Sequence, residues 1–221
     1  MEKFVLYLDI MGFKERVNNT PISKLKQQLD DFKEKDNRLK PLLKGKDDKI
    51  LMEMAQFSDS IVLVSTDNKL YDLNRICKAA AILMQIALKT GFALRGAIAK
   101  GEMIFDENNK LFFGKALVDA YLLEEELCYY GIVFHESTEE IVERFLKKEV
   151  NKSFIIEEYS VPFKKGRSKH FHIAWHKMNE INQAANISET AKGWLKALRK
   201  TVSGNPRVYL DNTINMIESS E

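Results

Sequence analysis

The sequence is poor in the residue types that build covalent cross-links and metal centres. Its 221 residues include only two cysteines and four histidines. Cys77 and Cys128 make no CxxC pair and stand in apolar, helix-like segments, so we expect two reduced thiols and no disulfide framework. His170, His172 and His176 lie close together in the sequence, but no cysteine or carboxylate completes a ligand set. We therefore expect no zinc site.

Charge of one sign and long apolar runs are missing too. The 34 basic and 32 acidic residues leave a net charge of +2, which makes no case for a nucleic-acid or membrane partner. No apolar stretch approaches the ~20 residues of a membrane span, and the residues before Phe4 are too few to begin a signal peptide. Hydrophobic residues make up 45% of the chain, enough for a sizeable core. The composition predicts a soluble, cytoplasmic, globular protein.

The apolar periodicity predicts strands and helices in alternation. The expected strands are 4–9, 51–57, 61–64, 92–104, 111–113 and 132–134, and the expected helices are 22–32, 70–89 and 114–127. This order begins β-α-β-β-α-β, which predicts an α/β (α+β) fold of the ferredoxin-like type.

The rest of the chain predicts a C-terminal α/β extension. A helix is expected to begin at Ser137, because Glu140 follows at the spacing of a capping box. Strands are expected at 153–158 and 169–175, and helices at 188–201 and 206–218. We assign residues 1–180 to one α/β domain and residues 181–221 to a helical extension.

Two aspartates stand where this fold would bring them together. Asp9 ends the first strand, in FVLYLDIMGF, and Asp59 lies in the turn of QFSDSIVLV. Neighbouring carboxylates repel unless a cation lies between them, and Mg²⁺ or Mn²⁺ prefers oxygen ligands. The pair predicts a metal site, with the backbone carbonyl of Ile10 as a third ligand.

The residues after Asp9 offer contacts to phosphate. The amides of Met11, Gly12 and Phe13 open a helical segment, where N–H groups point outward. A metal that holds a triphosphate would explain both features. A second interpretation stays open, in which Asp9 caps a helix and FSDS is an ordinary hairpin turn.

Four segments carry a resemblance to a known family. YLDIMGFKERV, QFSDSIVLV, LRGAIAKGE and FGKALVDAYLLEEE resemble, in this order, the class III nucleotide cyclase domains. The chain looks most similar to the small bacterial cyclases of the Pycsar antiphage systems, with a weaker likeness in FKKGRSKHFHI. The resemblance implies a palm-type phosphorus–oxygen lyase that converts UTP or CTP to the 3′,5′-cyclic monophosphate and pyrophosphate. The product would act as a second messenger on a separate effector protein.

The resemblance also implies roles for single residues. Asp9 and Asp59 match the two aspartates that hold two metal ions per site in these cyclases. The enzymes are homodimers with composite sites, so Tyr121 would contact a base or the partner subunit. Lys165 in KKGRSK matches a lysine that binds the triphosphate.

Several positions depart from the purine-specific members. The lysine and aspartate that read a purine base are replaced by Ala55 and Leu111. The asparagine and arginine of the following helix are replaced by Val118 and Leu122. Arg95 is a candidate for the missing transition-state cation, and a surface ion pair is its other interpretation.

Two other functions therefore stay open. The chain could be a catalytically silent nucleotide-binding or regulatory homologue, or another palm-fold cyclase that makes a purine or dinucleotide product. The absence of a GGDEF-type hairpin argues against a diguanylate cyclase.

The acidic run on the helix at 114–127 is expected to be a solvated face: Asp119, Glu124, Glu125 and Glu126.

Overall fold

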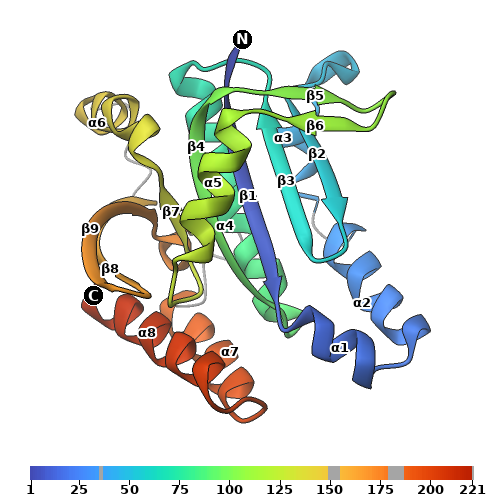
Figure 1. Ribbon diagram of the computed structural model, residues 1–221, viewed down its shortest axis with the longest axis vertical. Helices are drawn as coiled ribbons and strands as arrows, with labels where there is room; N and C mark the ends of the chain where they lie inside the picture. The colour runs from blue at the N-terminus through green and yellow to red at the C-terminus, as the bar shows by residue number, and fades with distance from the viewer. Residues whose placement is uncertain (35–36, 149–154, 179–186, 221) are drawn as a thin grey trace.

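A seven-stranded mixed sheet organises the computed structural model, which describes residues 1–34, 37–148, 155–178 and 187–220. The strand order is β2-β3-β1-β4-β7-β9-β8 (Figure 1). The strands of this sheet are β1 (Glu2–Met11), β2 (Met52–Phe57), β3 (Ser60–Ser65), β4 (Ala93–Glu102), β7 (Ile132–Phe134), β8 (Ile156–Phe163) and β9 (Gly166–Ile173). β4 and β7 run parallel, and the other neighbours are antiparallel.

The first half of the sheet confirms the ferredoxin-like prediction. Its order, β2-β3-β1-β4, is the one a β-α-β-β-α-β unit produces when the first strand pairs with both the third and the fourth. The helices of this unit are α1 (Phe13–Asn19), α2 (Ile22–Glu34) and α4 (Leu70–Lys89), with a short α3 (Lys40–Leu43) before β2. β1 is therefore flanked by a partner on each side.

The second half extends the sheet and closes the chain. A separate hairpin, β5 (Ile104–Asp106) and β6 (Leu111–Phe113), leads into α5 (Lys115–Glu125). The remaining helices are α6 (Glu139–Lys147), α7 (Ile187–Arg199) and α8 (Asn205–Ser219). Leu195, Leu210 and Ile217 from the last two helices belong to the same core as the sheet.

The two faces of β1 have different surroundings. Phe4, Leu6, Leu8 and Ile10 alternate onto the face covered by α4 and are buried in the main core. The other face carries Val5, Tyr7 and Asp9, and α5 crosses it in front of β4 (Figure 1). This second face, with its smaller apolar cluster, presents the polar side chains.

Four sequence predictions need comment. Ser137 does not cap a helix: α6 begins at Glu139, and the Ser137 hydroxyl instead accepts a hydrogen bond from the Lys100 amide at 2.9 Å. Cys77 is buried as expected, and Cys128 is partly exposed. The start of the strand expected at 153–158 and the domain boundary at residue 180 lie outside the described residues.

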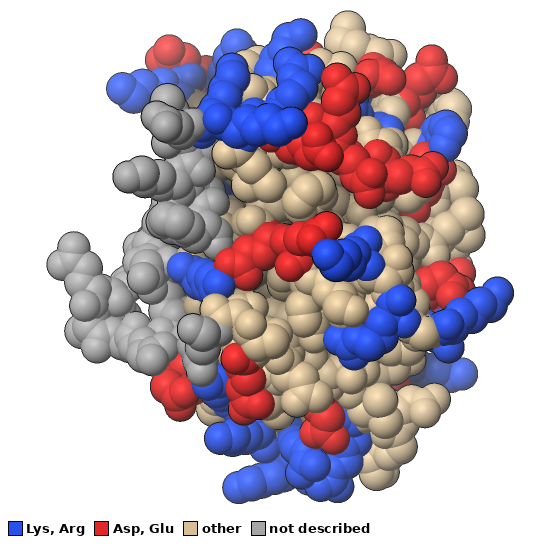
Figure 2. All heavy atoms as spheres, turned by 90° about the vertical axis from the view of Figure 1, so that its left-hand side faces the viewer, with Lys and Arg blue, Asp and Glu red and all other residues tan. Residues whose placement is uncertain are grey.

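Charges are mixed on the surface. Basic and acidic side chains are both present on the face shown in Figure 2. On β8 and β9, Lys169 pairs with Glu158 at 3.3 Å. Within the described residues, none of the helices is both long and apolar enough to span a bilayer.

Candidate functional site

Asp9 lies at the centre of the sheet, near the carboxyl end of β1. Its register partners are Ser60 on β3 and Arg95 on β4, so the three side chains share the face toward α5. The carboxyl group is only partly exposed to solvent. This places a charge-bearing side chain between a hydroxyl and a guanidinium on neighbouring strands.

Asp59 reaches the same place through a tight turn. Phe57 pairs with Ser60, so Ser58 and Asp59 alone connect β2 to β3. Ser58 has φ 53°, a left-handed conformation that glycine adopts more readily. The Asp59 carbonyl then accepts a hydrogen bond from the Ile10 amide at 2.8 Å. The turn that carries Asp59 is thereby joined directly to the end of β1.

The charge of Asp59 acts on the carboxyl group of Asp9. Burial, followed by the charge of Asp59, raises the pKa of Asp9 to about 6, and Arg95 opposes the shift. A carboxyl whose ionised form is disfavoured by a second carboxylate is one that a bound cation would favour. The turn that carries Asp59 thus lies beside Asp9, and a metal ion shared by the two carboxylates stays a prediction.

The main chain supplies a further oxygen. The N–H and C=O of one strand residue point to the same edge. Because the Ile10 amide faces the β2–β3 turn, its carbonyl faces that turn as well. Two carboxylates and a carbonyl fit a Mg²⁺ or Mn²⁺ ion that takes its remaining ligands from phosphate and water. Within the described residues, no group of three or more His, Cys, Asp and Glu side chains could hold a metal by itself.

The segment after β1 turns sharply into α1. Gly12 precedes the helix with φ 73°, a left-handed conformation that explains the need for glycine. Met11 and Phe13 on either side are partly buried against the main core. The predicted contacts between phosphate and the amides of these residues stay a prediction.

Arg95 forms an ion pair with Glu124, a residue that the sequence predicted to be solvated. Its Nε donates to Oε1 of Glu124 at 2.5 Å, and its Nη1 donates to the Leu127 carbonyl at 2.9 Å. The Glu124 side chain is 2% exposed, so the prediction of a solvated face is wrong for this residue. Burial raises the pKa of Glu124 to about 7, although Arg95 opposes the shift. Arg95 is thus a partner in a buried ion pair beside Asp9.

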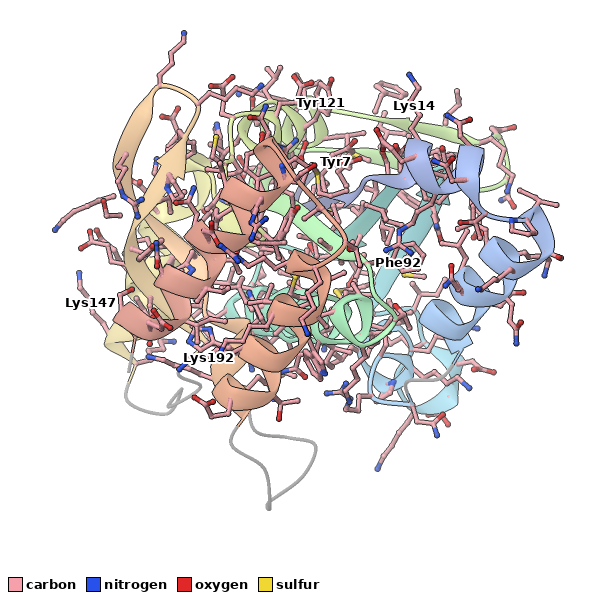
Figure 3. All side chains as sticks on the ribbon, turned by 90° about the horizontal axis from the view of Figure 1, so that it is seen from below. Tyr7, Lys14, Phe92, Tyr121, Lys147 and Lys192 are labelled. Carbon is pink, nitrogen blue, oxygen red and sulfur yellow. The ribbon has the colours of Figure 1, made fainter. Side chains whose placement is uncertain are left out.

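Tyrosines complete the polar face. The Tyr7 hydroxyl shares a hydrogen bond with Ser60 Oγ at 2.7 Å. Tyr121 from α5 meets the Tyr7 ring edge-on, with 5.5 Å between ring centroids (Figure 3). Tyr7 could have been suspected from the sequence, because it stands two residues before Asp9 and so shares its face.

The other predicted residues lie further from the two aspartates. Ala55 is on β2, on the same sheet face. Leu111 is at the outer end of the β5–β6 hairpin, and Lys165 is exposed in the β8–β9 turn, three strands from β1. The described contacts within one chain do not join Leu111 or Lys165 to the carboxylate pair.

An apolar surface borders the site. The exposed fractions of its side chains are about one half: Ile104 51%, Leu111 52%, Phe113 54%, Val118 53% and Leu122 53%. They come from the β5–β6 hairpin and the adjoining helix α5. We call this set the hairpin–α5 surface. Exposed apolar groups gathered on adjoining elements favour an interaction surface.

The histidines take no part in this site. His172 and His176 are both 1% exposed, and within the described part of the chain their ring nitrogens have no hydrogen-bond partner. Burial lowers the pKa of His172 to about 3 and that of His176 to about 4. Both rings are therefore neutral in the folded chain near pH 6.

Acid should destabilise the fold through these rings. As the pH falls from about 7 to 5, the histidines of the unfolded chain bind protons while the folded ones do not, which costs on the order of 1–2 kcal/mol per ring. Asp9 and Glu124 act in the opposite direction, so the test compares variants. We expect the urea-unfolding free energy of His172→Phe to fall less between pH 7 and pH 5 than that of the wild type. Equal acid dependence would contradict the prediction.

Comparison with known proteins finds likeness among solved structures alone. No family model and no curated protein sequence matches the chain. Among solved structures, the chain is similar to a class III adenylyl cyclase-like ATP-binding protein from Pseudomonas aeruginosa, with a TM-score of 0.45 and 13% sequence identity. The match covers 63% of this chain and 34% of that protein, so the chain spans about a third of its length. A likeness at this level assigns neither a family nor an activity.

Proposed function

We propose that the chain is a metal-dependent nucleotide cyclase. It would convert a pyrimidine nucleoside triphosphate, UTP or CTP, to the 3′,5′-cyclic monophosphate and pyrophosphate. The observation that carries the proposal is the Asp9–Asp59 pair at the end of β1, with a main-chain carbonyl directed to the same place. The resemblance of the surrounding segments to class III cyclases supports the choice of reaction.

The residues of the chain would mainly position the substrate. Asp9, Asp59 and the Ile10 carbonyl would hold two Mg²⁺ or Mn²⁺ ions, which when bound stabilise negative charge on the phosphates. The amides at 11–13 would contact the triphosphate. The 3′-oxygen of the ribose then forms a bond to the α-phosphorus, the bond to pyrophosphate breaks, and the hydroxyl proton passes to water. The cyclic product would signal phage infection to a separate effector protein.

The proposed base preference rests on the absence of the two residues that read a purine base in the cyclases that the sequence resembles. Ala55 offers no charge or hydrogen bond to a purine, and neither does Leu111. A small apolar position on the sheet face leaves the choice of base to main-chain groups and to Tyr121. We propose a pyrimidine on this ground, and UTP and CTP remain equal candidates.

A panel of substrates tests the proposal. The purified chain is incubated with each of ATP, GTP, UTP and CTP in the presence of Mn²⁺, and the products are separated by chromatography. We expect cyclic UMP or cyclic CMP and little cyclic purine product. Linear dinucleotides or a purine product would favour another palm-fold cyclase.

A silent nucleotide-binding subunit is the second candidate. It is favoured by the pairing of Arg95 with Glu124 and the Leu127 carbonyl, because a guanidinium held in this way has fewer donors left for a phosphate. Saturable binding of UTP with Mn²⁺, without turnover, would support this candidate.

Assembly into a homodimer is part of the proposal. The described contacts do not join Leu111 or Lys165 to the carboxylate pair of their own chain, and in the cyclases that the sequence resembles such residues serve the partner's site. The hairpin–α5 surface supplies exposed apolar area for a two-fold interface.

A charge placed on this surface should separate the dimer. We expect light scattering to give twice the 25.5 kDa chain mass for the wild type and the single mass for Leu122→Glu. Cyclase activity should fall with the dimer, because each site would need both chains. The matched control is Leu146→Glu on α6, where a leucine of similar exposure, 42%, lies outside the surface. A monomeric wild type with full activity would contradict the composite site.

A further inference from the structure

A cavity lies beside the carboxylate site. It encloses about 520 Å³ between α1 on one side and the α7–α8 pair on the other, within the size range of pockets that bind small organic molecules. Its apolar lining includes Met11, Ala93, Tyr130 and Leu210. Seen from below, Phe92 lies between the two groups of helices (Figure 3).

One cationic side chain of the cavity is partly buried. Arg16 lines the wall formed by α1, and its Nη2 donates to the Gly91 carbonyl. Its guanidinium carbon lies 4.4 Å from the centroid of the Phe92 ring. Burial lowers the pKa of Arg16, so the surroundings disfavour its charge. Among the described residues, none of the ion pairs includes Arg16.

This arrangement leaves most of the N–H donors of Arg16 available to an anion. A guanidinium has five N–H donors, and one of them is used by the Gly91 carbonyl. Among the described residues that line the cavity, Glu15 is the only one with a carboxylate, and it is exposed, so solvent screens its charge. An anionic group that entered the cavity would make charge-assisted hydrogen bonds with Arg16.

We propose that this cavity binds a small amphipathic carboxylate, with an apolar body on the floor of the cavity and its carboxylate on Arg16. A single cation suits a monoanion, whereas a nucleotide would bring several negative charges and a polar sugar onto an apolar floor. The proposal does not rest on the cyclase reaction, because it concerns binding to a separate set of side chains.

The position of the cavity suggests an effect on the neighbouring site. Met11 follows Asp9 by two residues and its register partner Ala93 precedes Arg95 by two, so both lie on the same sheet face about 7 Å from that pair. On the other wall, α8 places the Tyr209 ring 5.8 Å from the Arg95 guanidinium carbon. A ligand between α1 and α8 would thus contact both elements that flank the carboxylate pair.

Matched probes test the binding. Octanoate and 1-octanol share an apolar chain and differ in the charge of the head group. In isothermal titration of the full chain we expect saturable binding of one octanoate per chain, and binding of octanol weaker by about tenfold. Equal affinity for the two probes, or no saturable binding of octanoate, overturns the proposal.

Variants locate the probe. Arg16→Gln should weaken octanoate about tenfold and leave octanol unchanged, and Val202→Trp should abolish both by filling the cavity. The matched controls are Arg144→Gln on α6 and Val208→Trp on α8, at positions outside the cavity lining. Circular dichroism checks that each variant is folded, and if Arg16→Gln is not, the two probes on the wild type still decide. Octanoate binding that survives Val202→Trp places the probe elsewhere and overturns the proposal.

Discussion

An Asp9→Asn chain should form no cyclic nucleotide above background and, without metal, should be more stable than the wild type. The amide keeps the shape of the side chain and removes the charge that burial and Asp59 disfavour. We expect product formation to fall at least about a hundredfold, because the remaining carboxylate holds the metal ions poorly. We expect the unfolding free energy at pH 7.5 to rise on the order of 1 kcal/mol.

The sign of this stability change follows from the raised pKa. The pKa of Asp9 is 3.8 in the unfolded chain and about 6 in the folded chain, so the folded state loses stability as the pH rises between these values. The advantage of Asp9→Asn should therefore be small at pH 4 and complete above pH 7.

Unfolding curves with and without metal measure both effects. Mn²⁺ should stabilise the wild type and leave Asp9→Asn and Asp59→Asn unchanged, since each lacks one half of the pair. Asp30→Asn on α2 is the control, because this aspartate pairs with the exposed Lys26 away from the site. Wild-type turnover in Asp9→Asn at saturating Mn²⁺ would falsify the metal assignment.

Removal of Glu124 should be the most destabilising single change at the site. Glu124→Ala would leave the Arg95 guanidinium, whose side chain is 11% exposed, without its carboxylate. Breaking a buried ion pair from one side costs about 3–5 kcal/mol. Glu124→Gln should cost less, because the amide oxygen still accepts the hydrogen bond from Nε.

The same variants bear on catalysis. In Glu124→Gln, Arg95 is held less firmly and has more freedom to meet a phosphate, so binding of UTP with Mn²⁺ should be retained or improved. Glu126→Ala is the control, because Glu126 forms a half-exposed pair with Lys164 at 3.8 Å and should cost less than about 1 kcal/mol. Urea unfolding and nucleotide titration measure the two effects. A loss at Glu124→Ala no larger than at Glu126→Ala would show that the pair contributes little.

The positions of Asp9 at a strand end and of Asp59 in a turn were predictable, because local sequence signals mark both places. An apolar run that ends in Asp9 and a short polar break at Asp59 each mark a strand end, and the strand order brings the ends together. The ferredoxin-like order was predictable for the same reason, since each of its elements carries a strong apolar period. The small differences at element ends, such as α6 starting at Glu139, depend on contacts with distant residues, here the hydrogen bond that Ser137 accepts from the Lys100 amide.

The burial of Glu124 and the cavity between α1 and the α7–α8 pair were not predictable in this way. A run of three acidic residues on a helix is typical of a solvated face. Glu124 can be buried because it pairs with Arg95, which lies 29 positions earlier in the sequence, on β4. The cavity depends on α1 and the α7–α8 pair, which are far apart in the sequence. Neither juxtaposition leaves a period or a motif in the chain.

The two-sided pairing of β1 determines how its amide protons exchange with water. β1 is in register with β3 through Asp9 and with β4 through Met11, so its central N–H groups become free only when one of these ladders separates. β7 and β9 are in register only at Val133 and His172, so fewer ladder hydrogen bonds join the β8–β9 hairpin to the sheet, and we expect this edge to open at a lower free energy than β1. In hydrogen exchange, the strand that carries Asp9 should therefore be among the last to take up deuterium, while the far edge of the sheet opens many times. The scaffold beneath the carboxylate pair is thus the part of the molecule least disturbed by local unfolding.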